Sequence, residues 1–246
     1  MRPTSCIVDL AAIEKNVRTL SALVAPVSMC AVVKADGYGH GAVPAAKAAI
    51  AGGARWLAVA LVEEGIEFRE AGIALPILVM SEPPPTSMEA IVSHELTPTI
   101  YSEAGLAAIG SAAERQSKNV QIHLGVDSGM GRVGLKPDEI ASFVMSVQGF
   151  PNLSVSAIWT HCPVADEPDN PFTATQLADF GAAVRSQADG VGLHVANSAT
   201  VFTGQASSAG DPLMVRCGIS IYGIDPDPAV AGMVELEPAL TLRSEV

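Results

Sequence analysis

The 246-residue sequence has few charged residues, and most of these are acidic. Charged residues make up 16% of the chain, and 26 Asp and Glu against 14 Lys and Arg give a formal net charge of −12. This balance argues against nucleic acid or an anionic membrane as a partner. The sequence has no run of the roughly 18 uncharged apolar residues that would span a bilayer, and its N-terminus does not read as a secretory signal. We therefore expect a cytoplasmic protein with no membrane or nucleic-acid partner.

Cysteine is scarce as well. Cys6, Cys30, Cys162 and Cys217 are far apart and show no CxxC or CxxH spacing. We therefore expect neither a metal site nor a disulfide framework. Three of the four lie in apolar runs, where a reduced thiol packed in the core is the simpler interpretation.

Strand-like and helix-like segments alternate along most of the chain. Strands are expected at residues 29–33, 56–62, 76–81, 96–101, 120–127, 153–161, 192–196 and 213–217. Helices are expected at residues 10–23, 43–51, 63–71, 88–94, 102–116, 137–147 and 172–188. Eight strands separated by helices or long loops predict an α/β fold, a closed (β/α)8 TIM barrel. An open doubly wound sheet is the weaker alternative, because no GxGxxG follows the first strand.

Two further strand-like segments, at residues 6–10 and 239–246, have no place in the barrel. Because they lie at opposite ends of the chain, we expect both to join one separate sheet.

Lys34 stands at the end of the first buried strand, where a glycine-rich turn begins. Such a turn breaks the strand and lets backbone approach a ligand closely. Burial and neighbouring charge can lower the pKa of a lysine until its free amine reacts with carbonyls. A lone lysine here would more simply extend into the loop and reach solvent.

The residues around Lys34 favour the reactive lysine. Residues 31–41 read Ala-Val-Val-Lys-Ala-Asp-Gly-Tyr-Gly-His-Gly, which resembles the signature of alanine racemases over eleven positions. The resemblance implies that Lys34 is catalytic and carries pyridoxal 5'-phosphate (PLP), and that Tyr38 binds the phosphate of PLP.

Four further motifs resemble the same family. Residues 127–134, Asp-Ser-Gly-Met-Gly-Arg-Val-Gly, imply that Arg132 binds the substrate carboxylate. A planar guanidinium suits this role because it can donate two parallel hydrogen bonds. Residues 158–161, Ile-Trp-Thr-His, imply that His161 contacts the cofactor and orients Arg216.

The other two motifs imply contacts to the phosphate and to the cofactor ring. Residues 194–198, His-Val-Ala-Asn-Ser, and 215–223, Val-Arg-Cys-Gly-Ile-Ser-Ile-Tyr-Gly, carry these residues. Arg216 would face the pyridine nitrogen and keep it unprotonated, which favours proton exchange over other PLP reactions. The remaining cofactor-binding residues implied by the two motifs are Asn197, Ser198, Gly218 and Ile219.

One position departs from the family pattern. Many alanine racemases have a carbamylated lysine where this chain has Gly125, and that lysine holds the substrate-binding arginine. Glycine cannot do this. Either a water, a chloride or another side chain supports Arg132, or Arg132 is less firmly held.

The resemblance also implies the domain plan and the reaction. Residues 11–234 would form the PLP-binding barrel, and residues 1–10 and 235–246 would belong to a C-terminal β domain that this sequence lacks. The reaction would be interconversion of L-alanine and D-alanine, which supplies D-alanine for peptidoglycan in the cell wall. In the family a tyrosine from the β domain of the partner subunit, in a head-to-tail homodimer, is the second base. We therefore expect this chain alone to be weakly active or inactive.

Three alternatives remain at this point. The first is a single-barrel PLP-binding protein of the cofactor-homeostasis type, against which the Lys34 and Arg216 motifs argue. The second is an amino-acid racemase of broader specificity. The third is a barrel that binds no PLP, in which Lys34 is purely structural.

Overall fold

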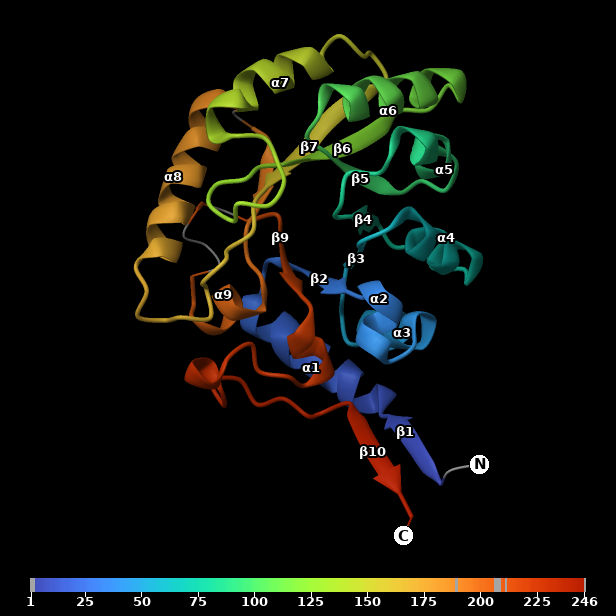
Figure 1. Cartoon of the computed structure of the whole chain (residues 1–246), viewed down its shortest axis with the longest axis vertical. Coiled ribbons are helices and arrows are strands. Elements are labelled where there is room, and N and C mark those ends of the chain that lie inside the picture. Colours follow the sequence, from blue (N-terminus) through green and yellow to red (C-terminus); the bar gives the residue numbers. More distant parts are fainter. Residues whose placement is uncertain (1–2, 189, 206–208, 211, 246) are drawn as a thin grey trace.

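A parallel β-barrel forms the body of the protein (Figure 1). The computed structural model describes residues 3–188, 190–205, 209–210 and 212–245. Neighbouring barrel strands follow the order β8-β7-β6-β5-β4-β3-β2-β9, and every pair is parallel. Backbone hydrogen bonds from Leu213, just before β9, to Leu193 of β8 (2.7 Å) and from Arg216 of β9 to Ala196, just after β8 (2.9 Å), bring the first and last strands of this order together. The predicted TIM barrel is confirmed.

The barrel strands are β2 (Ser28–Val32), β3 (Trp56–Val59), β4 (Ile77–Val79), β5 (Thr97–Ile100), β6 (Val120–Gly125), β7 (Leu153–Trp159), β8 (Gly192–His194) and β9 (Met214–Cys217). The α-helices are α1 (Leu10–Val24), α2 (Lys34–Gly39), α3 (Ala42–Ala51), α4 (Val62–Glu70), α5 (Met88–Ser93), α6 (Glu103–Arg115), α7 (Ile140–Val147), α8 (Phe172–Gln187) and α9 (Ser198–Phe202). Short 3-10 turns are η1 (Pro85–Ser87), η2 (Pro137–Glu139), η3 (Ile219–Tyr222) and η4 (Pro228–Val230).

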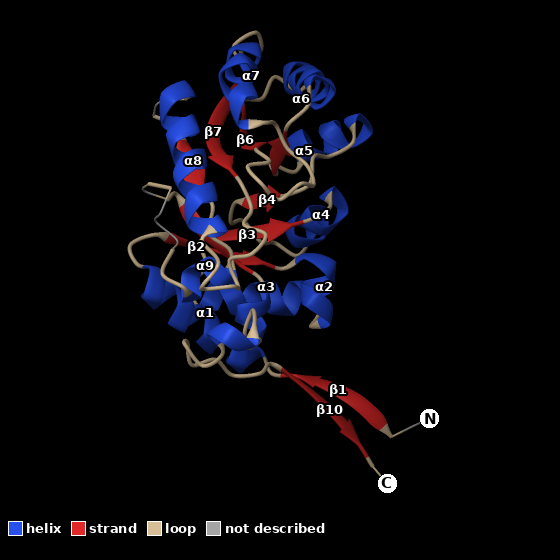
Figure 2. Cartoon of the chain, turned by 60° about the vertical axis from the view of Figure 1, so that its left-hand side comes forward, coloured by secondary structure: helices blue, strands red, loops and turns tan. Residues whose placement is uncertain are grey.

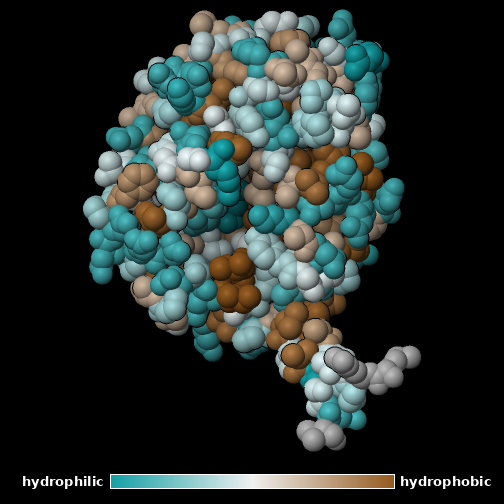
Figure 3. Space-filling model, viewed as in Figure 1, coloured by the Kyte–Doolittle hydropathy of each residue, from teal (hydrophilic) through white to brown (hydrophobic). Residues whose placement is uncertain are grey.

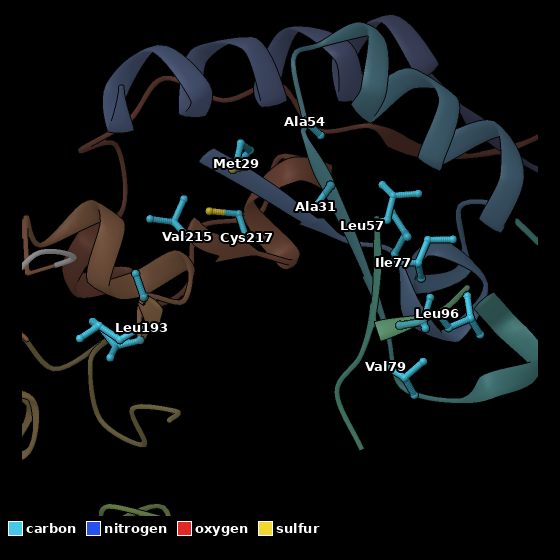
Figure 4. Packing of buried hydrophobic residues seen from close by; sticks show 14 of the residues in the cluster. Met29, Ala31, Ala54, Leu57, Ile77, Val79, Leu96, Leu193, Val215 and Cys217 are labelled. Carbon is cyan, nitrogen blue, oxygen red and sulfur yellow. The ribbon is translucent and has the colours of Figure 1, made fainter. Parts of the chain in front are cut away.

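Alternation along the strands separates two layers of core. In β2, Met29 and Ala31 pack in the large cluster between the strands and the outer helices, whereas Cys30 and Val32 belong to a small cluster inside the barrel. Successive side chains of a strand point to opposite faces, so this sorting follows from strand geometry. Figure 4 shows part of the larger cluster around Met29, with residues from several strands. Both faces of β2 are therefore apolar, as is typical of a strand that is buried on both sides in a barrel.

Two further strands form a ribbon outside the barrel. β1 (Thr4–Val8) pairs antiparallel with β10 (Leu240–Ser244). The ribbon stands away from the barrel (Figure 2), and hydrophobic side chains gather where it leaves the body (Figure 3). The expected pairing of the two end segments is therefore observed, whereas their assignment to a separate domain stays a prediction.

Apart from β2, which has the predicted length and is shifted by one residue, the observed barrel strands are shorter than the predicted ones, mainly at their carboxyl ends. β3 ends at Val59 and β8 at His194, although the apolar pattern continues for two or three residues beyond each strand. These residues leave the hydrogen-bonded ladder and belong to the segments that lead from each strand into the next helix, at one end of the barrel. The structure also contains α9, a short helix that the apolar pattern does not predict. No helix among the described residues is long and apolar enough to cross a membrane.

Candidate active site

A cavity of about 560 Å³ opens at the carboxyl ends of the barrel strands. This is the end at which barrel enzymes place their active sites. All nine residues that the motifs imply for the site line this cavity. They are Lys34, Tyr38, Arg132, His161, Asn197, Ser198, Arg216, Gly218 and Ile219.

Lys34 follows β2 after one intervening residue, Val33, and is half-buried at the cavity wall. Its ammonium nitrogen lies 5.9 Å from the centroid of the Tyr38 ring. The next four residues, at positions 35–38, have φ between 52° and 59° and form a left-handed turn. Three of these four are not glycine, although a left-handed conformation costs an L-residue roughly 1–2 kcal/mol. The predicted glycine-rich turn is present, but most of the residues in the left-handed conformation are not glycines.

Three hydrogen-bonding groups converge beside this turn. The backbone N–H of Gly218 donates to the Ser198 hydroxyl (3.2 Å), and the Ser220 hydroxyl lies 2.9 Å from the same oxygen. A Cβ atom at Gly218 would stand 2.7 Å from the Tyr38 hydroxyl. Glycine at 218 therefore lets the Tyr38 hydroxyl approach the backbone next to Ser198.

Asn197 connects two loops of the cavity wall. Its side-chain oxygen accepts a hydrogen bond from the Thr200 N–H and so caps α9. Its side-chain nitrogen donates to the Cys162 carbonyl (3.2 Å). Both polar atoms of this side chain are thus engaged within the protein.

Arg216 lies at the floor of the cavity, with 3% of its surface exposed. Its guanidinium donates to the backbone carbonyls of Thr160 (2.8 Å), His194 (3.0 Å) and Val195 (3.3 Å). It also lies 4.8 Å from the centroid of the Trp159 ring. Burial lowers the pKa of Arg216 to about 10, which leaves it charged at neutral pH.

A second histidine, His194, holds the Arg216 side chain. Nη1 of Arg216 lies 2.6 Å from Nδ1 of His194, and Nε2 of His194 lies 3.0 Å from Nδ1 of His123. Because a guanidinium only donates, Nδ1 of His194 must accept and its proton sits on Nε2. Nδ1 of His123 therefore accepts a hydrogen bond from Nε2–H of His194. The proton of His123 then sits on its own Nε2, which has no hydrogen-bond partner among the described residues. Burial, followed by the charge of Arg216, lowers the pKa of His123 to about 3 and that of His194 well below its usual value.

The expected orienting of Arg216 by His161 needs correction. Among the described residues, the hydrogen bonds of the guanidinium go to the His194 ring and to backbone carbonyls. His161 instead forms part of the cavity wall, and its carbonyl accepts a hydrogen bond from Gln176. Burial, then the charges of Arg216, Arg132 and Lys34, lower the pKa of His161 to about 3. His161 is therefore a neutral wall residue.

Arg132 lies on an exposed loop at the cavity edge. The carboxylate of Asp127 gathers this loop by accepting the backbone N–H groups of Gly129 (3.1 Å), Gly131 (2.9 Å) and Arg132 (2.9 Å). Burial alone would raise the pKa of Asp127, but these N–H groups bring it below its usual value. Within the described residues the Arg132 guanidinium itself has no hydrogen bond, so the backbone positions it.

The space beside Gly125 is filled by neighbouring side chains. A Cβ atom there would lie 3.0 Å from Cγ2 of Thr99 and 3.3 Å from Cδ1 of Tyr101. A long side chain at this position would therefore need its neighbours to move. Tyr101 lines the cavity, as does Trp159, and the motifs assigned a role to neither. Sequence could have indicated both residues as part of the site, because they lie at the carboxyl ends of β5 and β7 and the strand ends form the cavity.

The fold and the cavity define an α/β-barrel protein with an enzyme-like site at the carboxyl ends of its strands. A family model described as alanine racemase, N-terminal domain, matches residues 8–226. The chain therefore belongs to the alanine racemase family.

Known proteins similar to this chain include alanine racemases from Symbiobacterium thermophilum and Desulfovibrio desulfuricans. They are 40% and 37% identical over the whole chain, which covers 66% and 67% of their lengths. A solved alanine racemase from D-cycloserine-producing Streptomyces lavendulae has a TM-score of 0.88 at 32% identity, over 99% of this chain and 65% of its own. An alanine racemase from Clostridium difficile, in complex with cycloserine, has a TM-score of 0.89 at 30% identity. The match covers 98% of this chain and 68% of that one. The chain thus spans about two thirds of the length of its relatives.

Proposed function

We propose that this chain carries the cofactor site and one proton-transferring base of a PLP-dependent alanine racemase. The supporting observation is the convergence of Lys34, Arg216 and the Tyr38–Ser198–Gly218 group on one cavity. The reaction would interconvert L-alanine and D-alanine and so supply D-alanine for the cell wall. In its working form the protein would be a cytoplasmic head-to-tail dimer.

The donors on this wall fit a PLP phosphate. The hydroxyls of Ser198 and Tyr38 and the N–H of Gly218 are close together, and hydrogen-bond donors of this kind are what a phosphate needs. Arg216 offers a fixed positive charge to the ring nitrogen. When bound, PLP delocalises the electron pair left when the α-proton departs.

The chain's own residues would divide the remaining work. Lys34 would carry the cofactor covalently and, once released, would remove or deliver the α-proton on one face of the substrate at its amine nitrogen. Arg132 would bind the substrate carboxylate from the cavity edge, and Asn197, Ile219 and His161 would enclose the cofactor.

Racemisation needs acid/base groups on both faces of the α-carbon. Tyr38 and Tyr101 also line the cavity, but we assign the first to the phosphate and give the second no acid/base role. The second base would come from the partner subunit. We expect the chain alone to exchange the α-proton of one enantiomer and to racemise poorly.

Titration of the purified chain with PLP tests this proposal first. Lysine-bound PLP should absorb near the visible edge in the wild type and in Lys47→Ala, a control that removes an exposed lysine of α3. Lys34→Ala should lose this band. A Lys34→Ala variant that keeps the band would contradict the lysine assignment.

The second test follows proton exchange and chirality together. The PLP-loaded chain is incubated with L-alanine or D-alanine in D2O, and both α-deuteration and stereochemistry are measured. We expect deuteration of one enantiomer with little racemisation. Rapid racemisation by the chain alone would contradict the two-base argument, and no deuteration of either enantiomer would contradict a catalytic Lys34.

A further inference from the structure

The turn that follows Lys34 is held at two points. At its far end, Gly37 is buried, and a Cβ atom there would lie 3.1 Å from Cβ of Ala45 in α3. At the near end, the backbone N–H of Ala35 donates to Oε1 of Glu64 (2.6 Å). Within the described structure, the other hydrogen bonds from N–H groups of residues 35–42 stay inside residues 33–42. Glu64 is therefore the contact that ties the residue after Lys34 to another element.

The same carboxylate also fixes the loop after β3. Its second oxygen, Oε2, accepts the N–H groups of Ala60 (2.8 Å) and Leu61 (3.0 Å). Ala60 lines the cavity, and Glu64 is the third residue of α4. One side chain thus joins the ends of two neighbouring strands at the cavity wall.

Part of this arrangement is ordinary helix capping. A glutamate at the third helical position commonly reaches back to the N–H that precedes the helix, as Oε2 does with Leu61. Capping does not require the other oxygen to reach Ala35, 29 residues away in sequence. That bond holds a left-handed turn whose residues are mostly not glycine.

We propose that Glu64 is a positioning residue for Lys34. Its carboxylate holds the strained turn against the loop after β3 and thereby fixes the direction in which the Lys34 amine enters the cavity. The value of this positioning for PLP rests on the proposed function, whereas the positioning itself is a property of the cofactor-free chain.

Three variants separate this role from capping and from charge. Glu64→Asp keeps an acidic cap on α4 but is one methylene too short to span both loops. Glu64→Gln keeps the length but replaces one accepting oxygen with a donor. Glu63→Gln removes the same charge from the same helical turn, at an exposed side chain with no hydrogen bond to the turn among the described residues, and serves as the matched control.

Two measurements on the cofactor-free chain decide the proposal. Amide hydrogen exchange of residues 35–41 should become at least tenfold faster in both Glu64 variants and stay unchanged in Glu63→Gln. In Glu64→Asp the later N–H groups of α4, which bond within the helix, should remain protected. Limited reductive methylation, read by mass spectrometry, should label Lys34 at least threefold faster relative to exposed Lys47 in the Glu64 variants.

Unchanged exchange in the turn would overturn the proposal. Faster exchange with an unchanged Lys34-to-Lys47 ratio would also overturn it, because Glu64 would then support the loop without positioning the lysine. If Glu64→Gln does not fold, the milder Glu64→Asp decides between these outcomes.

PLP binding links the inference to the function. We expect the dissociation constant for PLP to rise at least tenfold in the Glu64 variants and to stay constant in Glu63→Gln. If the wild-type chain binds no PLP at Lys34 while the labelling ratio still changes, the proposed function fails and the positioning role stands. If the Lys34-to-Lys47 labelling ratio changes in the Glu64 variants while their PLP affinity does not, the positioning of Lys34 by Glu64 has no importance for cofactor binding.

Discussion

Arg216 and Arg132 border the same cavity but are held in different ways. Arg216 is held by its guanidinium, whereas Arg132 is held by its backbone. The Arg216 guanidinium is buried and bonded to three backbone carbonyls and a histidine. Arg132 is exposed, and the carboxylate of Asp127 holds its backbone N–H. The Arg216 charge is fixed by its hydrogen bonds, whereas the Arg132 guanidinium, on a loop held by its backbone, has no such bond among the described residues.

This difference fits two kinds of contact. A permanently fixed charge suits a group that stays in place, as a bound cofactor ring does in the proposed function. A charge on a free side chain can close on a substrate that arrives and leaves. Lys34 resembles Arg132 in this respect, because Glu64 accepts a hydrogen bond from the backbone beside it, and the Lys34 amine itself has no hydrogen bond among the described residues.

The largest expected effect comes from removing the fixed charge. Arg216→Met leaves three buried carbonyls and Nδ1 of His194 without their donor, and we expect it to destabilise the chain by about 3 kcal/mol. Arg132→Met should change stability by no more than about 0.5 kcal/mol, because no buried group loses a partner. Urea unfolding followed by circular dichroism measures both. Equal losses in the two variants would contradict the contrast between the arginines.

Acid should weaken the support of Arg216. A histidine whose pKa is lower in the folded than in the unfolded protein contributes its full stability above the unfolded pKa. That contribution is lost as the pH falls from the unfolded pKa toward the folded pKa. For His123, with a folded pKa of about 3 against 6.5, the loss between pH 7 and pH 5 is about 2 kcal/mol. His123→Asn keeps a polar group near Nδ1, and its unfolding free energy should fall by that much less over the same range. Parallel pH profiles for the two proteins would contradict the neutral histidine pair.

The gathering of the motif residues at one cavity was predictable from sequence, whereas the contacts that support them were not, and the roles of these residues stay predictions. Lys34 and Arg216 lie in long motifs at strand ends, and the barrel brings those ends together whatever the details of packing. The hydrogen bond from the Ala35 N–H to Glu64 and that from the Arg216 guanidinium to His194 join segments far apart in the chain. Such contacts depend on three-dimensional placement, and a local pattern carries no sign of them.

The backbone of the Lys34 turn illustrates the same limit. Glycines at 37, 39 and 41 correctly indicated a turn that ends the strand. The left-handed conformation of Ala35, Asp36 and Tyr38 is not what these residue types prefer, and tertiary contacts impose it. A sequence pattern predicts preferences, so it fails where the fold overrides them.

The smallest expected effect concerns the loop that carries Arg132. In Asp127→Asn one accepting oxygen is lost, so the amides of residues 129–132 should exchange about tenfold faster at neutral pH, while global stability falls by no more than about 1 kcal/mol. Because the folded pKa of Asp127 lies below its ordinary value of 3.8, the carboxylate supports the loop above that value and loses this effect as the pH falls through the folded pKa. The difference in exchange between variant and wild type should therefore shrink below pH 3.8. A difference that persists in acid would mean that side-chain shape, and not the charged carboxylate, holds the loop, and the backbone support of Arg132 would then need another explanation.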